Sequence, residues 1–130
     1  MKMVDVAVGV VIREDQTFVC LRASDKHQGG KWEFPGGKVE VNETAENALC
    51  RELQEEIAIT VTHTQPLLTI THDYGDKQVR LVVFIVDAFI GEPKGNEGQP
   101  GKWLPVSALN PADFPAANAA IIEAVKQRIL

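Results

Sequence analysis

The sequence predicts an α/β fold in which helices cover both faces of a mixed β-sheet. Three observations support this prediction. Apolar residues alternate with a period of two near the N-terminus, which is typical of a strand, and two further strand-like segments flank a turn in the second half of the chain. A segment with helical spacing lies between these regions, and a second amphipathic segment closes the chain. The 130 residues, of which 45% are hydrophobic, suit a single domain over residues 1–130.

The first predicted hairpin covers residues 4–22. Residues 4–12 place four valines and one isoleucine on one face, and they place Asp5, Ala7, Gly9 and Val11 on the other. The turn is expected at residues 14–16 and the returning strand at residues 17–22. The small residues Ala7 and Gly9 allow two interpretations, since they either let a helix pack closely or form the floor of a pocket.

The remaining elements follow from spacing and turn chemistry. A glycine-rich loop is expected at residues 24–37, and Thr44 is a candidate N-cap for a helix over residues 45–57. Residues 67–74 and 79–90 are predicted to be strands around a turn at residues 75–77. A polar loop at residues 91–101, a short strand at residues 102–106 and a helix over residues 116–129 complete the expected fold.

The helix predicted at residues 45–57 is unusually acidic. At 100° per residue its leucines share one face, while Glu52, Glu55 and Glu56 lie three and four positions apart on an adjacent face. Like charges at this spacing cost on the order of a few tenths of a kcal/mol per pair, and Arg51 alone offers local relief. Each glutamate taken singly is ordinarily solvated. Three converging carboxylates, however, favour Mg²⁺ or Mn²⁺, which bridges carboxylates to phosphates.

Composition excludes several classes of protein. The net charge of −5 and the pI of about 5.1 argue against a nucleic-acid binder, which needs a basic surface. No apolar run is long enough to span a bilayer and the N-terminus lacks the features of a signal peptide, so we expect a cytoplasmic protein without a membrane partner. Cys20 and Cys50 lack metal-site spacing and are expected to be reduced core thiols.

One segment matches a known motif. The pattern G-x5-E-x7-R-E-U-x-E-E-x-G-U, where U is aliphatic, is matched at Gly37, Glu43, Arg51, Glu52, Leu53, Glu55, Glu56 and Ile59. The chain therefore resembles the Nudix hydrolase superfamily, and residues 31–40, 91–103 and 113–121 are similar to segments of its MutT-type members. Ala58 departs from the motif where glycine is expected. Because that glycine adopts a left-handed cap, alanine implies about 1 kcal/mol of strain or a different helix exit.

The resemblance implies a Nudix-type α/β/α sandwich with a mixed central sheet and hydrolysis of a nucleoside triphosphate to the monophosphate and pyrophosphate. It implies Mg²⁺ as cofactor, with Mn²⁺ as a substitute. Arg51 is expected to orient carboxylates, Glu43 to complement the helix dipole, and Glu52 to act as general base on the attacking water. The expected metal ligands are Glu52, Glu55, Glu56, the carbonyl of Gly36, and Glu97 as a further ligand or base.

The same resemblance implies a nucleotide site. Arg22 and Lys38 are expected to contact phosphates, and His27 is expected beside the nucleotide. The base is expected in a slot shaped by the small strand face together with Glu33, Phe34, Pro35 and Gly36. Core packing is the alternative for Phe34 and Trp32. Asn118 is expected to bind the purine edge, since its amide has both a donor and an acceptor, although an asparagine near a helix start is usually a cap.

Three functions remain open on this basis. The first is hydrolysis of oxidised purine nucleoside triphosphates, such as 8-oxo-dGTP, by a monomer whose partner is this small molecule. The second is a Nudix hydrolase acting on another nucleotide, such as a modified cytosine triphosphate or a dinucleotide. The third is a non-catalytic Nudix-fold module that inspects purines. The complete set of motif carboxylates argues against the third.

Overall fold

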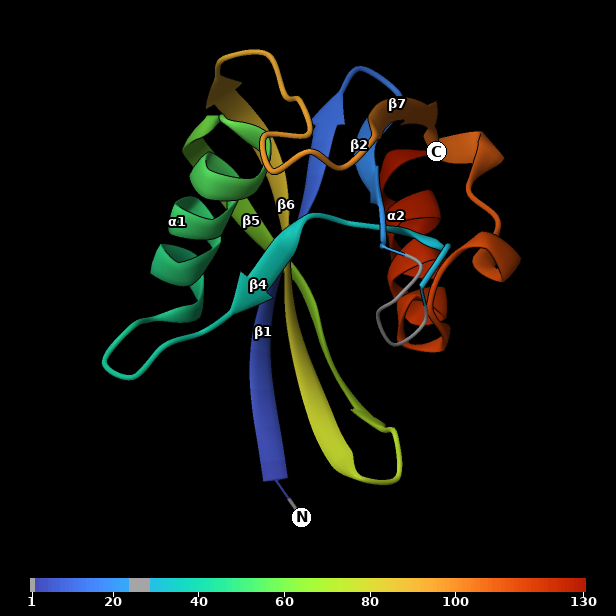
Figure 1. Cartoon of the computed structure of the whole chain (residues 1–130). Coiled ribbons are helices and arrows are strands. Elements are labelled where there is room, and N and C mark those ends of the chain that lie inside the picture. The colour runs from blue at the N-terminus through green and yellow to red at the C-terminus, as the bar shows by residue number, and fades with distance from the viewer. Residues whose placement is uncertain (1, 24–28) are drawn as a thin grey trace.

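The computed structural model describes residues 2–23 and 29–130, and Figure 1 shows its elements in space. The described ranges form one seven-stranded sheet and two α-helices. The helices are α1 (Ala45–Ile57) and α2 (Ala119–Ile129). The strands are β1 (Lys2–Arg13), β2 (Gln16–Leu21), β3 (Trp32–Glu33), β4 (Gly36–Lys38), β5 (Thr60–Asp73), β6 (Lys77–Ile90) and β7 (Gly101–Pro105).

The sheet is mixed, as the sequence predicts. Its strand order is β3-β2-β1-β6-β5, while β4 pairs with β1 and β7 pairs with β2. The β1–β6 pair is parallel and the β5–β6 pair is antiparallel. Helices α1 and α2 lie on opposite sides of the central strands (Figure 1), so the expected α/β/α layering is confirmed. Each helix closes one of two apolar clusters.

The period-two pattern of β1 distributes its side chains between these two clusters. Val8 and Val10 join the cluster that includes α2, and Ala7 and Val11 join the cluster that includes α1. A Cβ on Gly9 would lie 2.9 Å from a methyl group of Leu53. The small face of β1 therefore lets α1 pack closely, and the interpretation of that face as a pocket floor is wrong.

Several element boundaries differ from the predictions. The expected loop at residues 24–37 contains β3 and the start of β4, which are held by pairing with distant strands. Strand β5 begins at Thr60 rather than at residue 67. Its first half is polar because β5 is an edge strand, where bulges and Pro66 are tolerated. Residues 116–118 form a 3₁₀ turn before α2 rather than its first turn.

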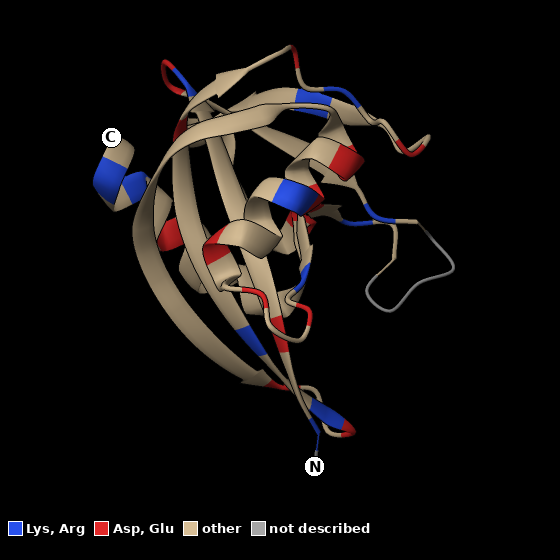
Figure 2. Ribbon diagram, turned by 90° about the vertical axis from the view of Figure 1, so that its left-hand side faces the viewer, with Lys and Arg blue, Asp and Glu red and all other residues tan. Residues whose placement is uncertain are grey.

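Basic and acidic residues are mixed over the part of the chain that the structure describes. Figure 2 shows Lys and Arg interspersed with Asp and Glu over the ribbon. No helix in the described part of the chain is long and apolar enough to cross a membrane. The two cysteines are free thiols; Cys20 is buried within the cluster under α1, whereas Cys50 is only half-buried.

Candidate functional site

Helix α1 is fixed at both ends by its own sequence. Thr44 is the N-cap, as predicted, and its side-chain oxygen accepts a hydrogen bond of 3.1 Å from the Asn47 N–H. The helix ends at Ile57, and Ala58 adopts φ 63° and ψ 35°, the left-handed cap that glycine normally provides. The Ala58 N–H donates to the Gln54 carbonyl at 3.1 Å. The predicted strain at Ala58 therefore follows from its conformation.

The paired glycines of β4 bring its backbone close to both the sheet and α1. A Cβ on Gly36 would lie 2.0 Å from the carbonyl oxygen of Ala7 in β1, with which β4 pairs. A Cβ on Gly37 would lie 2.2 Å from the carboxyl carbon of Glu52. The Gly36 N–H donates to Glu56 at 3.3 Å. Glycine at both positions thus allows β4 to run beside the carboxylates of α1.

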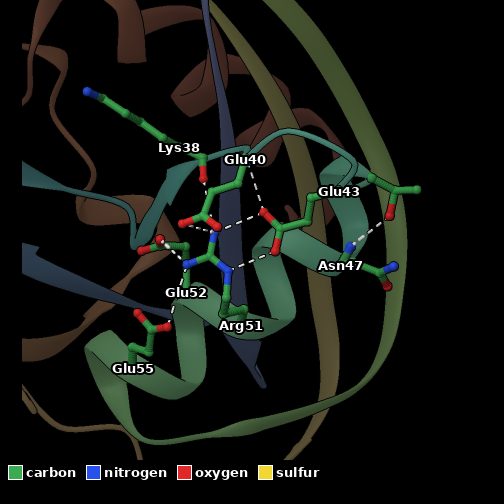
Figure 3. Close-up of polar contacts among 8 residues, drawn as sticks. Lys38, Glu40, Glu43, Asn47, Arg51, Glu52 and Glu55 are labelled. Atoms are coloured by element: carbon green, nitrogen blue, oxygen red, sulfur yellow. Dashed lines mark hydrogen bonds and ion pairs between the residues drawn. The ribbon is translucent and has the colours of Figure 1, made fainter.

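Arg51 organises the carboxylates around it (Figure 3). Its guanidinium donates to Glu43 at 2.8 and 2.9 Å and to Glu52 at 2.7 Å. It lies 3.5 Å from Glu55 and donates to the Lys38 carbonyl at 3.2 Å. The arrangement agrees with the expectation that Arg51 orients carboxylates by charge-assisted hydrogen bonds.

Glu43 does more than complement the helix dipole, so that expectation is corrected. It accepts the two hydrogen bonds from Arg51 and one of 3.0 Å from the Glu40 N–H. These bonds lower the pKa of Glu43 to about 2, with the Arg51 hydrogen bonds as the main cause. Glu43 therefore anchors Arg51, which in turn holds Glu52.

Glu56 lies in a different electrostatic setting. It is half-buried and accepts one hydrogen bond, from the Gly36 N–H. The pKa of Glu56 is raised to about 8, mainly by burial; the Gly36 N–H lowers it, and the neighbouring carboxylates Glu33, Glu97 and Glu52 contribute to the rise. The carboxylates around Glu56 therefore oppose its ionisation and favour a bound cation.

The convergence expected for three helix carboxylates is not present. Within residues 2–23 and 29–130, no three His, Cys, Asp or Glu side chains lie close enough together to hold a metal ion. Glu55 is drawn toward Arg51 and does not line the cavity, while Glu52 and Glu56 do. The physical reason is that the carboxylates repel one another, and Arg51 is the cation that Glu52 and Glu55 contact.

A cavity of about 860 Å³ lies beside these residues, which is within the usual size range of ligand sites. One part is rich in carboxylates and the other is mainly apolar. The carboxylates come from β3, from α1 and from the loop before β7, and they are Glu33, Glu52, Glu56 and Glu97. The apolar part is formed by Val4, Val6, Val8, Phe34, Tyr74, Val79, Leu81, Pro115 and Ala117.

The residues expected at the phosphates are found at this cavity. Arg22 and Lys38 both line it, as do Gly36 and Gly37. Arg22 donates to Glu33 at 2.7 Å, so an arriving phosphate would compete with this carboxylate for the guanidinium. His27 lies outside the described residues.

Only some of the residues expected at the nucleotide base line the cavity. Phe34 lines the cavity and also stacks on Phe114 at 5.3 Å between ring centroids, so it belongs to both core and pocket. Pro35 is buried and does not line the cavity, and its carbonyl accepts a hydrogen bond from the Gly9 N–H at 2.8 Å. Trp32 packs against the core, which was the alternative to a role at the nucleotide base.

Asn118 lies at the start of α2 but does not cap it. Its side chain makes no capping hydrogen bond, and it lines the cavity beside Ala117. The cap alternative for Asn118 is therefore not supported by the structure. Its amide carries both a donor and an acceptor, which a purine edge would need.

Sequence reasoning missed much of the apolar wall. Val4, Val6 and Val8 line the cavity, whereas the base slot was expected on the opposite face of β1. The period-two pattern identifies both faces, but it does not show which one α1 covers. Tyr74 and Lys77 flank the β5–β6 turn and also line the cavity, and no local motif marks them.

The chain is similar to known proteins over almost its whole length. Residues 7–124 match the family model described as the NUDIX domain. An 8-oxo-dGTP diphosphatase of Escherichia coli K12 is 42% identical over 128 residues, 98% of this chain and 99% of that protein. A CTP pyrophosphohydrolase of the same strain is 33% identical over 124 residues, 92% of each. A solved structure from work on MutT of Aliivibrio salmonicida and Vibrio cholerae has a TM-score of 0.85 at 37% identity, covering 98% of this chain and 99% of its own.

Proposed function

The chain belongs to the Nudix family, and from this premise we propose that it hydrolyses 8-oxo-dGTP and related oxidised purine nucleoside triphosphates to the monophosphate and pyrophosphate. Its close homologues carry the name 8-oxo-dGTP diphosphatase. The observation that most directly supports the proposal is one continuous cavity. It is lined by the carboxylates Glu52 and Glu56, by apolar side chains and by Asn118.

The carboxylate part of the cavity offers hard oxygen donors for a divalent cation, which Nudix hydrolases generally use. Among the described residues these side chains lie too far apart to hold the ion as they stand, so they would have to close on it. Glu56 is half-buried beside carboxylates that raise its pKa, and a bound cation would offset their charge. We propose Mg²⁺, with Mn²⁺ as a substitute, held by Glu52, Glu56, Glu97 and the carbonyl of Gly36, but not by Glu55, because it contacts Arg51 and does not line the cavity. When bound, the ion would neutralise charge that develops on the phosphoryl group.

The protein groups divide the remaining work of hydrolysis. Arg51 holds one oxygen of Glu52 at 2.7 Å and thereby fixes the orientation of the carboxylate that we propose as general base. This base takes the proton from the attacking water. Arg22 and Lys38 bind the phosphates, and the triphosphate displaces Glu33 from Arg22. Phe34 and the valines of β1 exclude water from one side of the base.

Asn118 supplies the selectivity in this proposal. Guanine presents acceptors at O6 and N7, whereas 8-oxoguanine in its keto form carries a hydrogen on N7. The Asn118 amide matches the oxidised edge, since its NH₂ donates to O6 and its oxygen accepts from N7–H. Undamaged guanine would leave two acceptors facing each other.

The similarity to a CTP pyrophosphohydrolase favours a second candidate, hydrolysis of a cytosine or modified cytosine triphosphate. The Asn118 amide is also able to pair with the donor and acceptor on a cytosine edge. A dinucleotide substrate and a non-catalytic purine-inspecting module have less support, the latter because all motif carboxylates are present. We further propose that the chain acts as one domain and as a monomer.

A nucleotide screen tests the proposal directly. The purified protein is incubated with Mg²⁺ and with 8-oxo-dGTP, dGTP, CTP, 5-methyl-dCTP or a dinucleotide, and pyrophosphate and phosphate are detected separately. We expect pyrophosphate from 8-oxo-dGTP at the highest kcat/KM and no product after addition of EDTA. Glu56→Gln serves as the inactive control. A higher kcat/KM with a cytosine nucleotide would replace the first candidate by the second.

A further inference from the structure

The loop between β6 and β7 is fastened to the C-terminal end of α1. The last carbonyls of a helix have no partner within the helix and need donors from elsewhere. The Asn96 side chain donates to the Glu55 carbonyl at 3.0 Å, and the Asn96 backbone N–H donates to the Glu56 carbonyl at 2.9 Å. The Lys94 N–H donates to the Ile57 carbonyl at 3.1 Å. These bonds fix the base of the loop against the helix.

The Gln99 side chain extends this attachment from α1 to the backbone of Glu97. Its side-chain NH₂ donates to the Glu56 carbonyl at 3.0 Å, and its side-chain oxygen accepts from the Glu97 N–H at 3.0 Å. Gln99 is half-buried and itself lines the cavity. A single amide therefore links the backbones of two carboxylate residues of the cavity that are far apart in the sequence.

The segment around Glu97 needs such a link. Glu97 is exposed and stands between Gly95 and Gly98, and Gly98 has φ +87°. Glycines leave a segment many backbone conformations, so its position depends on the bonds that hold it. The loop is also compact, because a Cβ on Gly95 would lie 1.6 Å from the Gln99 carbonyl oxygen. The Asn96 bonds stop one residue before Glu97, and the Gln99 side chain accepts a hydrogen bond from the Glu97 backbone itself.

We propose that Gln99 is a positioning residue that holds Glu97 at the cavity opposite Glu56. The expected effect of Gln99 on kcat rests on the proposed role of Glu97 as metal ligand or base. The expected effect of Gln99 on the position of the Glu97 backbone does not depend on that role. Displacing a catalytic group by about 1 Å costs about 10²-fold in rate, which sets the scale of the effect.

The test uses Gln99→Met, which keeps the length of the side chain and removes its hydrogen bonds to the Glu56 carbonyl, to the Cys20 sulfur and from the Glu97 N–H. We expect kcat for 8-oxo-dGTP to fall about 10- to 100-fold while KM changes less than about threefold, because Gln99 acts on Glu97 and not on the base. In a Glu97→Gln background the same substitution should give no further loss of kcat. Gln99→Ala should behave in the same way and serves if Gln99→Met does not fold.

A second readout does not depend on activity. Amide hydrogen exchange at Glu97 should be faster in Gln99→Met than in the unsubstituted protein, since its acceptor has been removed. Gln65→Met is the matched control. Gln65 also makes two side-chain hydrogen bonds, to Asp87 and from Arg128, but it does not line the cavity. Gln65→Met should leave kcat and the exchange at Glu97 unchanged.

Each outcome bears on the proposal. Unchanged exchange at Glu97 in Gln99→Met would overturn it, and so would an equal loss of kcat in the presence and absence of Glu97. The proposal is supported if Gln99→Met speeds the exchange at Glu97 and lowers kcat only in the protein that retains Glu97. If the unsubstituted protein hydrolyses no nucleotide, the proposed function fails, and the exchange measurement still decides whether Gln99 fixes Glu97.

Discussion

Replacement of Glu56 by glutamine should stabilise the metal-free protein at mildly alkaline pH, although it removes a carboxylate from the site. In the native protein, burial and the carboxylates Glu33, Glu97 and Glu52 raise the pKa of Glu56 to about 8, from a usual value of 4.5. Ionised Glu56 therefore destabilises the folded state when no cation is bound. Glutamine has nearly the same size and keeps an oxygen that accepts from the Gly36 N–H.

The linkage between protonation and folding gives the sign and the size of this change in unfolding free energy. Between pH 4.5 and about pH 8 the native state keeps a proton on Glu56 that the unfolded state has released. The native state thus binds more protons, and the free energy of unfolding falls as pH rises through this window. The difference between the two pKa values corresponds to a loss of up to about 5 kcal/mol above pH 8, and Glu56→Gln avoids this loss.

The assay is urea unfolding from pH 4.5 to pH 9 in EDTA, and the compared quantity is the difference in unfolding free energy between variant and wild type. We expect this difference to grow in favour of Glu56→Gln with rising pH. Glu123→Gln, at an exposed glutamate of α2, is the control and should give no trend. Millimolar Mg²⁺ should then stabilise the wild type and not Glu56→Gln. Parallel pH profiles for wild type and Glu56→Gln would show that the folded state does not raise the pKa of Glu56.

Two further predictions concern the backbone around the site. Ala58→Gly should raise the free energy of unfolding by about 0.5–1 kcal/mol, because Ala58 has φ 63°, and a thermal melt that shows no gain would contradict this. Gly37→Ala should lower kcat with little loss of stability, because its Cβ would meet the flexible carboxylate of Glu52. Gly36→Ala should instead lower the melting temperature, because its Cβ would meet the carbonyl oxygen of Ala7. If the two substitutions change the melting temperature and kcat equally, this difference between the two glycines does not exist.

Local signals in the sequence were sufficient for α1 and its caps. Thr44 has the side chain that an N-cap needs, and Ala58 occupies the position where the motif expects a left-handed residue, so the structure matches both. The two faces of β1 were also predictable. Which face lines the cavity was not, because that depends on where α1 packs, and this packing is a tertiary property.

The arrangement of the site depended on contacts that sequence spacing does not contain. Spacing places Glu52, Glu55 and Glu56 on neighbouring positions of α1, but their side chains respond to charge, and Arg51 draws Glu55 away from the cavity. The early start of β5 reflects pairing with β6 rather than its own polar composition. Gln99 was missed because its partners are the backbones of residues 56 and 97, which no local motif connects.

Selection of an oxidised purine by Asn118 can be tested with a single comparison. It is the ratio of kcat/KM for 8-oxo-dGTP to kcat/KM for dGTP, measured with Mg²⁺ for the wild type and for Asn118→Ala. A site with matched buried hydrogen bonds discriminates by about 10⁴-fold, so we expect a wild-type ratio of this order. Asn118→Ala should remove most of that ratio and leave the Mg²⁺ response of the melting temperature intact. A ratio that is the same in both proteins would show that Asn118 does not select the oxidised purine.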